Sequence, residues 1–429
     1  LQFVFPSIIM MIFTSIYSVV DGLFVSNFVG KSAFAAVNLI MPFLMGISAL
    51  GFMIGTGGSA IVAKTLGEGK TEKANEYFSM LVYITAIGGI IIAILSMFLV
   101  KPVAILFGAS GTLLDNCILY GRILCISLPA FMLQNVFQSF FVTAEKPHLG
   151  LRVIVIAGVT NMVLDFLFVA VLHFGLPGAG FATVCGEFIG GLFPLFYFGR
   201  KNSSLLKLRK THFHGKILLK TCTNGSSELM TNLSSSIVNA LYNMQLMKFA
   251  GEDGVAAYGT IMYVNFIFVS IFLGYAIGSA PIVSYHYGAG NQDELKNLFL
   301  KSIRLIGTWA VSLFVIAQLI ATPLATLFVG YDHGLFALTR NGFRLCRFAF
   351  LINGFNIYGS AFFTALNNGL LSALISFLRT LVFQMAIVLL LPLILGINGV
   401  WCSVAIAELL TLCVTGTFIV LERNTYHYL

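Results

Sequence analysis

Charged residues are scarce in this chain of 429 residues, and their scarcity excludes most classes of soluble protein. Asp, Glu, Lys and Arg make up only 9% of the sequence, whereas a soluble domain carries about 25%. Hydrophobic residues make up 58%, and the mean hydropathy is +0.95. This composition is typical of a polytopic membrane protein.

The patterns of an enzyme or a metal protein are also absent from the sequence. The seven cysteines form no CxxC pair and lie in or beside apolar runs, so we expect them to be small core residues. His212 and His214 have no Cys or Asp nearby to complete a metal site, and His286 has no partners for a catalytic triad. The glycine-rich stretch at 55–60 lacks the GK[ST] ending of a phosphate loop. We therefore expect neither an enzyme nor a cofactor-binding protein, with no metal beyond a coupling ion.

Long apolar runs separated by short polar breaks predict an all-α membrane protein, because barrel strands would be shorter and alternating. Twelve transmembrane helices are expected, near residues 3–28, 35–62, 76–100, 118–142, 149–172, 177–199, 217–249, 255–283, 299–322, 341–363, 370–395 and 397–421. The chain begins at Leu1, inside the first span, so a start methionine and a short leader are expected to precede it. It shows no cleavable signal-peptide pattern.

Basic residues mark one side of the membrane. The connections after spans 2, 4 and 6 carry eleven of them: Lys64, Lys70, Lys73, Lys146, Arg152, Arg200, Lys201, Lys207, Arg209, Lys210 and Lys216. The connection at 173–179 carries none. Because positive residues stay inside, we expect these three connections and both termini to be cytoplasmic, in a plasma (inner) membrane. Basic residues confined to helix ends do not indicate nucleic-acid binding.

The second half of the sequence repeats the first. Gly30 and Gly251 are 221 residues apart, and the same separation links Cys125 with Cys346 and Glu187 with Glu408, without a gap. Each unit holds six spans, so the two units keep the same orientation and form a parallel repeat. The predicted domains are an N-lobe (1–199), a cytoplasmic basic linker (200–216) and a C-lobe (217–429). Such pairs commonly enclose a central cavity, which favours a transporter.

Acidic residues inside apolar spans are the candidate functional residues, because a charge at membrane depth costs about 2.5–3.5 kcal/mol. Five are present: Asp21, Asp165, Glu187, Glu228 and Glu408. Tyr17 precedes Asp21 by one helical turn, and Asn161 precedes Asp165 by one turn. Thr183 is expected at a similar depth, in the outer half of the membrane. This set of oxygens suits Na⁺, and two close carboxylates equally suit a proton.

The repeat provides an internal control for this set. Its C-lobe counterparts are Val238, Tyr242, Val382, Ala386 and Val404, which retain a single phenol and no carboxylate. A set needed only for helix packing would be expected in both lobes. A buried hydrogen-bonded pair that fixes packing remains the alternative interpretation.

The remaining acids receive weaker assignments. Glu187 and Glu408 are equivalent in the repeat, which favours a shared structural role such as bonding a neighbouring helix. Glu228 begins a polar face of span 7 that continues through Asn232, Ser235 and Asn239 and is expected to line the cavity. These four residues are candidate contacts for a cationic cargo, although a carboxylate at a cytoplasmic helix end would explain Glu228 equally well.

Four motifs in this order resemble the multidrug and toxin extrusion (MATE) transporters, most closely the MepA-like branch. They are PSIIMMIFTSIYSVVDGLFVSNFVG in span 1, NMVLDFLFV in span 5, GLPGAGFAT before span 6 and APIVSYHYGAG after span 8. The resemblance implies a V-shaped pair of six-helix lobes that exports organic cations, driven by Na⁺ or H⁺. It also implies a cation site at Tyr17, Asp21, Asn161, Asp165 and Thr183. Another branch uses a carboxylate in helix 7, but the matching position here is near Ser236.

The function expected from these features is secondary active multidrug export by cation antiport. The expected partners are amphipathic organic cations and the lipid bilayer, and the protein is expected to act as a monomer. The alternative is a flippase of lipid-linked oligosaccharides from the same superfamily. Those flippases commonly have fourteen spans and a basic cavity, whereas this chain has twelve spans and prominent intramembrane acids.

Overall fold

The computed structural model describes residues 3–329 and 333–428, and its first half consists of six membrane-spanning helices. They are α1 (Val4–Phe24, continued by a π-helical segment η1, Val25–Val29), α2 (Lys31–Gly67), α3 (Thr71–Leu106), α4 (Gly111–Thr143), α5 (Pro147–Asp165, continued by the π-helical η2, Phe166–Val171) and α6 (Gly175–Gly199). We call α1–α6 the N-half.

The C-half begins with α7 (Gly215–Gly288), whose backbone breaks at Gly251 (φ 61°, ψ −147°), so that α7 forms two spans. The remaining elements are α8 (Gln292–Val329), α9 (His333–Cys346), a 3₁₀ turn η3 (Arg347–Leu351), α10 (Asn353–Ala365), α11 (Gly369–Phe377), a π-helical η4 (Leu378–Phe383), α12 (Gln384–Leu390), α13 (Pro392–Leu395) and α14 (Ile397–Tyr426). Residues 333–365 form one span and residues 369–395 another. Within the described ranges there is no strand, so the prediction of an all-α protein with twelve spans is confirmed.

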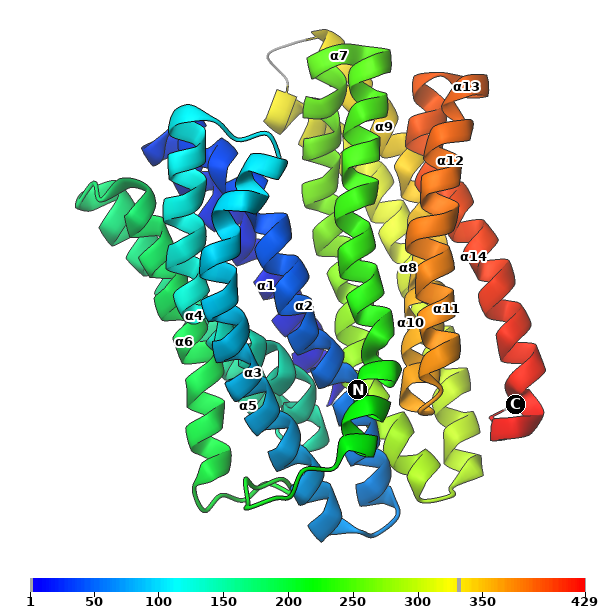
Figure 1. The fold of residues 1–429 in the computed structure, drawn as a ribbon. Helices are drawn as coiled ribbons and strands as arrows, with labels where there is room; N and C mark the ends of the chain where they lie inside the picture. Colours follow the sequence, from blue (N-terminus) through cyan, green and yellow to red (C-terminus); the bar gives the residue numbers. More distant parts are fainter. Residues whose placement is uncertain (1–2, 330–332, 429) are drawn as a thin grey trace.

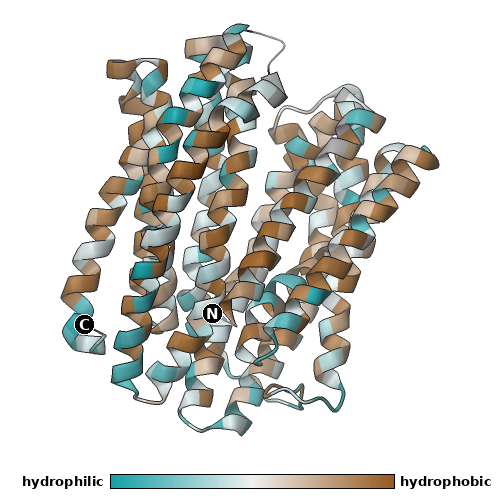
Figure 2. Cartoon of the chain, turned by 180° about the vertical axis from the view of Figure 1, so that it is seen from behind, coloured by the Kyte–Doolittle hydropathy of each residue, from teal (hydrophilic) through white to brown (hydrophobic). Residues whose placement is uncertain are grey.

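The seventh span is the most polar. Eleven helical segments among the described residues are long and apolar enough to cross a membrane, and the first part of α7 (215–250) is not among them. Its serines and asparagines lower its hydropathy. The ribbons of Figure 2 are coloured as hydrophobic over much of the length of the spans. On α3, for example, Ile87, Ile90, Ile94 and Phe98 are exposed and form a stripe suited to lipid.

The backbone confirms the repeat that the sequence predicts. Three pairs of glycines separated by 221 residues all have positive φ: Gly30 and Gly251, Gly69 and Gly290, and Gly175 and Gly396. Each of these glycines precedes or follows a helix at a tight reversal, where a residue with a Cβ would be strained. The same turns therefore recur at the same positions in both halves.

The two halves meet along a seam of closely packed helix ends. A Cβ added to Gly67 of α2 would lie 2.0 Å from the carbonyl oxygen of Tyr285, and one added to Gly288 would lie 2.1 Å from that of Lys64. The two contacts are exchanged by the 221-residue offset, so a pseudo-two-fold axis passes between α2 and the second part of α7. Figure 1 shows the two groups of helices approaching each other at this lower end, which the positive-inside rule predicts to be cytoplasmic.

Closer to the middle of the membrane the seam continues with the same symmetry. A Cβ on Gly57 would meet the backbone of Gly225 at 2.6 Å, and one on Gly278 would meet the Cα of Val4 at 3.0 Å. Gly57 and Gly278 are equivalent in the repeat, as are Val4 and Gly225. Small residues thus allow helices of opposite halves to touch through their backbones.

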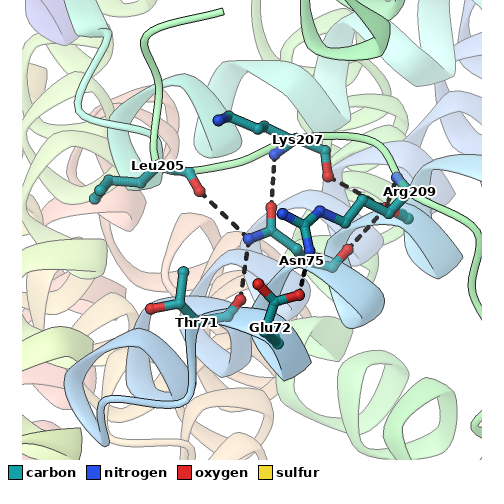
Figure 3. Close-up of polar contacts among 7 residues, drawn as sticks. Thr71, Glu72, Asn75, Leu205, Lys207 and Arg209 are labelled. Carbon is teal, nitrogen blue, oxygen red and sulfur yellow. Dashed lines mark hydrogen bonds and ion pairs between the residues drawn. The ribbon is translucent and has the colours of Figure 1, made fainter. Parts of the chain in front are cut away.

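The segment between the halves is bound to α3. The Asn75 side chain accepts a hydrogen bond from the amide of Lys207 (2.6 Å) and donates to the carbonyl of Leu205 (3.4 Å), and Arg209 pairs with Glu72 (Figure 3). Helix α7 begins at Gly215, slightly before the predicted boundary. The basic linker is therefore attached to the N-half up to the start of α7.

Candidate cation-binding site

The two aspartates of the predicted site lie beside irregular turns in their helices. Asp165 is the last residue of α5 before the π-helical η2, and Asp21 lies one turn before the π-helical η1. Such π-helical turns commonly occur at functional sites. The wider turns change the direction of each helix immediately after its carboxylate.

The structure brings Asp21 and Asp165 together. Their carboxyl groups interact with each other, and a proton on one of them would allow a hydrogen bond between the two. Asp165 is completely buried, and without such a proton both of its oxygens and Oδ1 of Asp21 lack a donor among the described residues. A buried carboxylate pair with no arginine or lysine beside it requires a proton or a cation between the two groups.

Asn161 and Thr183 complete the predicted cluster. The Asn161 amide nitrogen lies 3.5 Å from the Thr183 hydroxyl, which donates to the carbonyl of Ala179 on its own helix. Asn161 is 96% buried, and its Oδ1 has no hydrogen-bond partner within the described residues. An unpaired amide oxygen beside two carboxylates fits a hard cation such as Na⁺, and the site equally fits a shared proton.

Tyr17 lies beside this cluster, close to Asp21, Glu187 and Gln134. The prediction did not include Gln134 or Tyr120, which the structure places on α4 at the same site; Tyr120 is within reach of Thr183. Both are buried. The sequence does contain a signal for these two residues, because both are polar side chains in the middle of the apolar α4. A buried amide such as that of Gln134 needs a hydrogen-bond partner.

Glu187 contributes a third carboxyl group to this region. Its Oε2 accepts a hydrogen bond of 2.5 Å from Ser127 of α4, and its charge acts on both Asp21 and Tyr17. The side chain is only partly buried. Asp21 thus interacts with both Asp165 and Glu187, and in the described contacts no basic side chain is bonded to any of the three.

The equivalent glutamate of the C-half has a different environment. Glu408 forms an ion pair with Arg379 of η4, with Nη2 at 2.7 Å and Nε at 2.8 Å from Oε1. It also accepts a hydrogen bond of 2.7 Å from Asn356 of α10. Both glutamates bond neighbouring helices, as symmetry suggested, but only Glu408 has a built-in positive partner. Sequence reasoning did not single out Arg379, although it is a charge within an apolar span.

The C-half counterpart of the aspartate site is apolar and aromatic. Tyr242, which replaces Asp21, stacks on Tyr258 with ring centroids 5.3 Å apart, and the adjoining pocket is also lined by Phe343, Trp401 and Val404. No carboxylate lines this pocket. The chemistry of the aspartate cluster is thus confined to one half.

The candidate cargo residues lie along one face of the first part of α7. Asn239 accepts a hydrogen bond of 3.0 Å from the Tyr258 hydroxyl, and Asn232 donates to the carbonyl of Glu228. Ser235 is exposed and donates to the carbonyl of Thr231. Glu228 lies thirteen positions after the start of α7, at about 20 Å along the helix, so a helix-end role does not explain it. It is also within electrostatic reach of Arg379.

The profile of the MatE family matches residues 6–167 and 229–410, which together form most of the chain. The chain belongs to the MatE family of membrane transporters. The two matched segments correspond to the two halves of the repeat. The chain is therefore a multi-pass membrane protein with the fold and repeat of this family.

Individual relatives agree with this assignment. The multidrug export protein MepA of Staphylococcus saprophyticus is 22% identical over 428 residues, covering 98% of this chain and 92% of that protein. The FAD transporter of Shewanella oneidensis is 22% identical, over 73% of this chain and 70% of its own length. A solved multidrug resistance MATE transporter, described as outward-facing, superposes with a TM-score of 0.94 at 24% identity, covering 100% of this chain and 96% of that one.

Proposed function

We propose that this MATE transporter exports amphipathic organic cations, and that inward movement of Na⁺ or H⁺ drives the export. The observation that carries the proposal is the cluster of Asp21, Asp165 and Asn161 in the N-half. Buried side-chain oxygens of these three residues have no hydrogen-bond partner among the described residues. The equivalent positions of the C-half carry no carboxylate or amide. The MepA relatives, which are multidrug export proteins, support the same assignment of cargo. No cofactor is needed beyond the coupling ion.

The two halves would alternate between opening outward and opening inward. They act as lobes 1–199 and 217–429, joined by the linker 200–216. Because the seam closes the helix ends that carry the basic connections, which we propose to be cytoplasmic, we assign this arrangement to the state open to the outside. Release of cargo outward and entry of the coupling ion from outside both require this state. The protein would work as a monomer in the plasma membrane with both termini in the cytoplasm.

The orientation is tested with a single cysteine in a cysteine-free background. Phe174 is 55% exposed and lies in the connection without basic residues, immediately before α6. Phe174→Cys should react with an impermeant thiol reagent added to intact cells. Reaction only after permeabilisation would contradict the orientation.

The function is tested in proteoliposomes that contain the purified protein, with Na⁺ and proton gradients imposed separately. Export of a fluorescent organic cation should follow one of the two gradients and stop when that gradient is collapsed. The alternative flippase activity predicts translocation of a lipid-linked oligosaccharide with no transport of the dye. That result, or dye movement indifferent to both gradients, would reject the proposal.

A further inference from the structure

The equivalent glutamates of the two halves differ in their partners: Glu408 is paired with Arg379, whereas no basic side chain among the described residues is bonded to Glu187. The position equivalent to Arg379 in the N-half is Gly158. A Cβ added there would lie 2.6 Å from the Phe13 ring and 2.9 Å from the Tyr17 ring, so no arginine can replace it without moving these rings. The N-half thus has two aromatic rings where the C-half has a guanidinium group.

The carboxylate of Glu187 is available to a ligand. Ser127 occupies only its Oε2, and no hydrogen bond to Oε1 is present in the part of the chain that the structure describes. The side chain is partly exposed, in contrast to Glu408, which is 2% exposed and bonded through both oxygens. Asn161, whose Oδ1 has no hydrogen-bond partner among the described residues, packs against Gly186, the neighbour of Glu187. Tyr17 interacts with Glu187 and contacts the ring of Phe13.

We propose that Glu187 binds the positive nitrogen of the cargo. The N–H groups of the transported molecule would donate hydrogen bonds to Glu187, as the guanidinium of Arg379 donates to Glu408. This inference rests on the proposed export of organic cations and defines their class. The cargo would carry an amidinium, guanidinium or protonated amine, because these groups can donate hydrogen bonds to the free oxygen as the guanidinium of Arg379 does. An aromatic portion of the cargo would lie against Phe13 and Tyr17, whose faces attract cations.

Glu187 would therefore act separately from the aspartate pair. Asp21 and Asp165 are proposed to hold the coupling ion, while Glu187, one turn along α6 from Thr183, would hold the cargo. Their negative charges lie close enough to influence each other, since Asp21 and Glu187 interact electrostatically. Occupation of one site by a cation weakens the attraction of the other for a second cation, which is the competition that antiport requires.

The experiment compares the binding of two cations to purified protein in detergent. Stilbamidine is an aromatic diamidine with N–H donors, and tetraphenylphosphonium carries a positive charge but no donor. Glu187→Gln keeps the size of the side chain and an oxygen that can accept from Ser127. It should raise the Kd of stilbamidine roughly tenfold or more, as expected for loss of a charged hydrogen bond, and that of tetraphenylphosphonium by less than about threefold. Equal losses for both cations, or unchanged stilbamidine affinity, would overturn the proposal.

A measurement on the unsubstituted protein covers the case in which Glu187→Gln does not fold. A hydrophobic carbodiimide modifies carboxyl groups within the membrane, and peptide mass spectrometry locates the modification. Stilbamidine should protect Glu187, whereas tetraphenylphosphonium should protect it less at equal occupancy. Modification of Glu187 at an unchanged rate with bound stilbamidine would contradict the assignment. These binding tests do not depend on a gradient, so failure of driven export would reject the proposed function alone.

Discussion

At the scale of single residues, the two halves of the repeat place charge differently. Among the described residues, no basic side chain is bonded to the three carboxyl groups inside the spans of the N-half, while Glu408 of the C-half forms an ion pair with Arg379 and a hydrogen bond with Asn356. A charged group that is paired inside the protein contributes to packing, whereas one without a partner attracts a mobile cation. A glutamate at equivalent positions can therefore stabilise the fold in the C-half and take part in transport in the N-half.

Asp165→Asn is expected to abolish coupling while leaving the fold intact. The amide keeps the size of the side chain but can neither hold a proton at neutral pH nor balance a cation, so the rate of driven efflux should fall roughly tenfold or more. Asn161→Ala should weaken the site less, because it removes a dipole and not a charge. Efflux of a fluorescent cation at matched expression measures both.

The matched control for Asp165→Asn is the equivalent position of the C-half, where Ala386→Ser should be tolerated. If Asp165→Asn exports like the parent over a range of pH and Na⁺ concentration, the aspartate is structural and the proposed coupling site is wrong.

Glu408→Gln is expected to destabilise the protein. It leaves the guanidinium of Arg379, whose side chain is 15% exposed, without its negative partner. Breaking a buried pair from one side costs about 3–5 kcal/mol. The melting temperature in detergent should fall clearly below that of the parent and below that of Glu187→Gln, which breaks no ion pair.

The double variant Glu408→Gln with Arg379→Gln provides the control, because it removes both charges. Its melting temperature should recover part of the loss. An unchanged melting temperature for Glu408→Gln alone would show that the ion pair does not support the fold.

At the scale of helices, the seam depends on positions where only glycine fits. The Cβ of a side chain at Gly288 would lie 2.1 Å from the Lys64 carbonyl oxygen, far inside van der Waals contact. The π-helical segments are a second feature of the helices: η1 begins one turn after Asp21, η2 begins directly after Asp165, and η4 contains Arg379. Backbone geometry thus positions both the contact between halves and the charged groups.

Gly288→Ala should separate the two helix ends and weaken closure of the side that carries the basic connections. Both melting temperature and driven efflux should decrease. Gly88→Ala on α3 is the matched control, because a Cβ at Gly88 has nothing within 4 Å and alanine is favoured over glycine in a helix by about 1 kcal/mol. Equal behaviour of the two variants would show that the close contact at the seam is not needed.

At the scale of the whole molecule, the halves are separate packing units that share the seam. The largest apolar cluster is formed mainly by residues from Val238 to Tyr428 and receives only Val4 and Ile8 of α1 among its buried members from the N-half. The linker is bound to α3 through Asn75, so relative motion of the halves would be absorbed near the start of α7. Two bodies joined at one end suit a rocking motion about the pseudo-two-fold axis.

A disulfide across the seam should stop transport. Asn367 of the C-half donates to the carbonyl of Ala60 of the N-half at 3.5 Å, so these two positions are in contact across the seam and are chosen for the cysteine pair. In a background without other cysteines, oxidation should abolish driven efflux and reduction should restore it.

The control pair for this cross-link is Ser360→Cys with Ser376→Cys, whose hydroxyls are 2.9 Å apart within the C-half. A bond there joins residues of one body and should leave transport intact. Undiminished efflux in the oxidised seam variant would exclude a rocking motion at this interface.

The sequence by itself determined the number of helices, the repeat and the predicted cation cluster. Apolar runs have a length fixed by the membrane, and the constant separation of 221 residues requires no coordinates. The cost of burying a charge selects five acids, and the repeat then distinguishes Asp21 and Asp165, which have no acidic counterpart in the other half. The offset also anticipated the absence of the cluster from the C-half, where Tyr242 and Ala386 replace the two aspartates. Such features are local or periodic, so they can be read along the chain.

Only the tertiary structure decided which charges have partners. Arg379 and Glu408 are separated by 29 positions and meet because η4 and α14 lie side by side, and Gln134 reaches the aspartate site because α4 packs against α6. The glutamates 187 and 408 looked alike in the sequence, and the difference between them lies in neighbouring helices. Pairing between distant side chains depends on helix rotation and crossing geometry, which the hydrophobic pattern of one helix leaves undetermined.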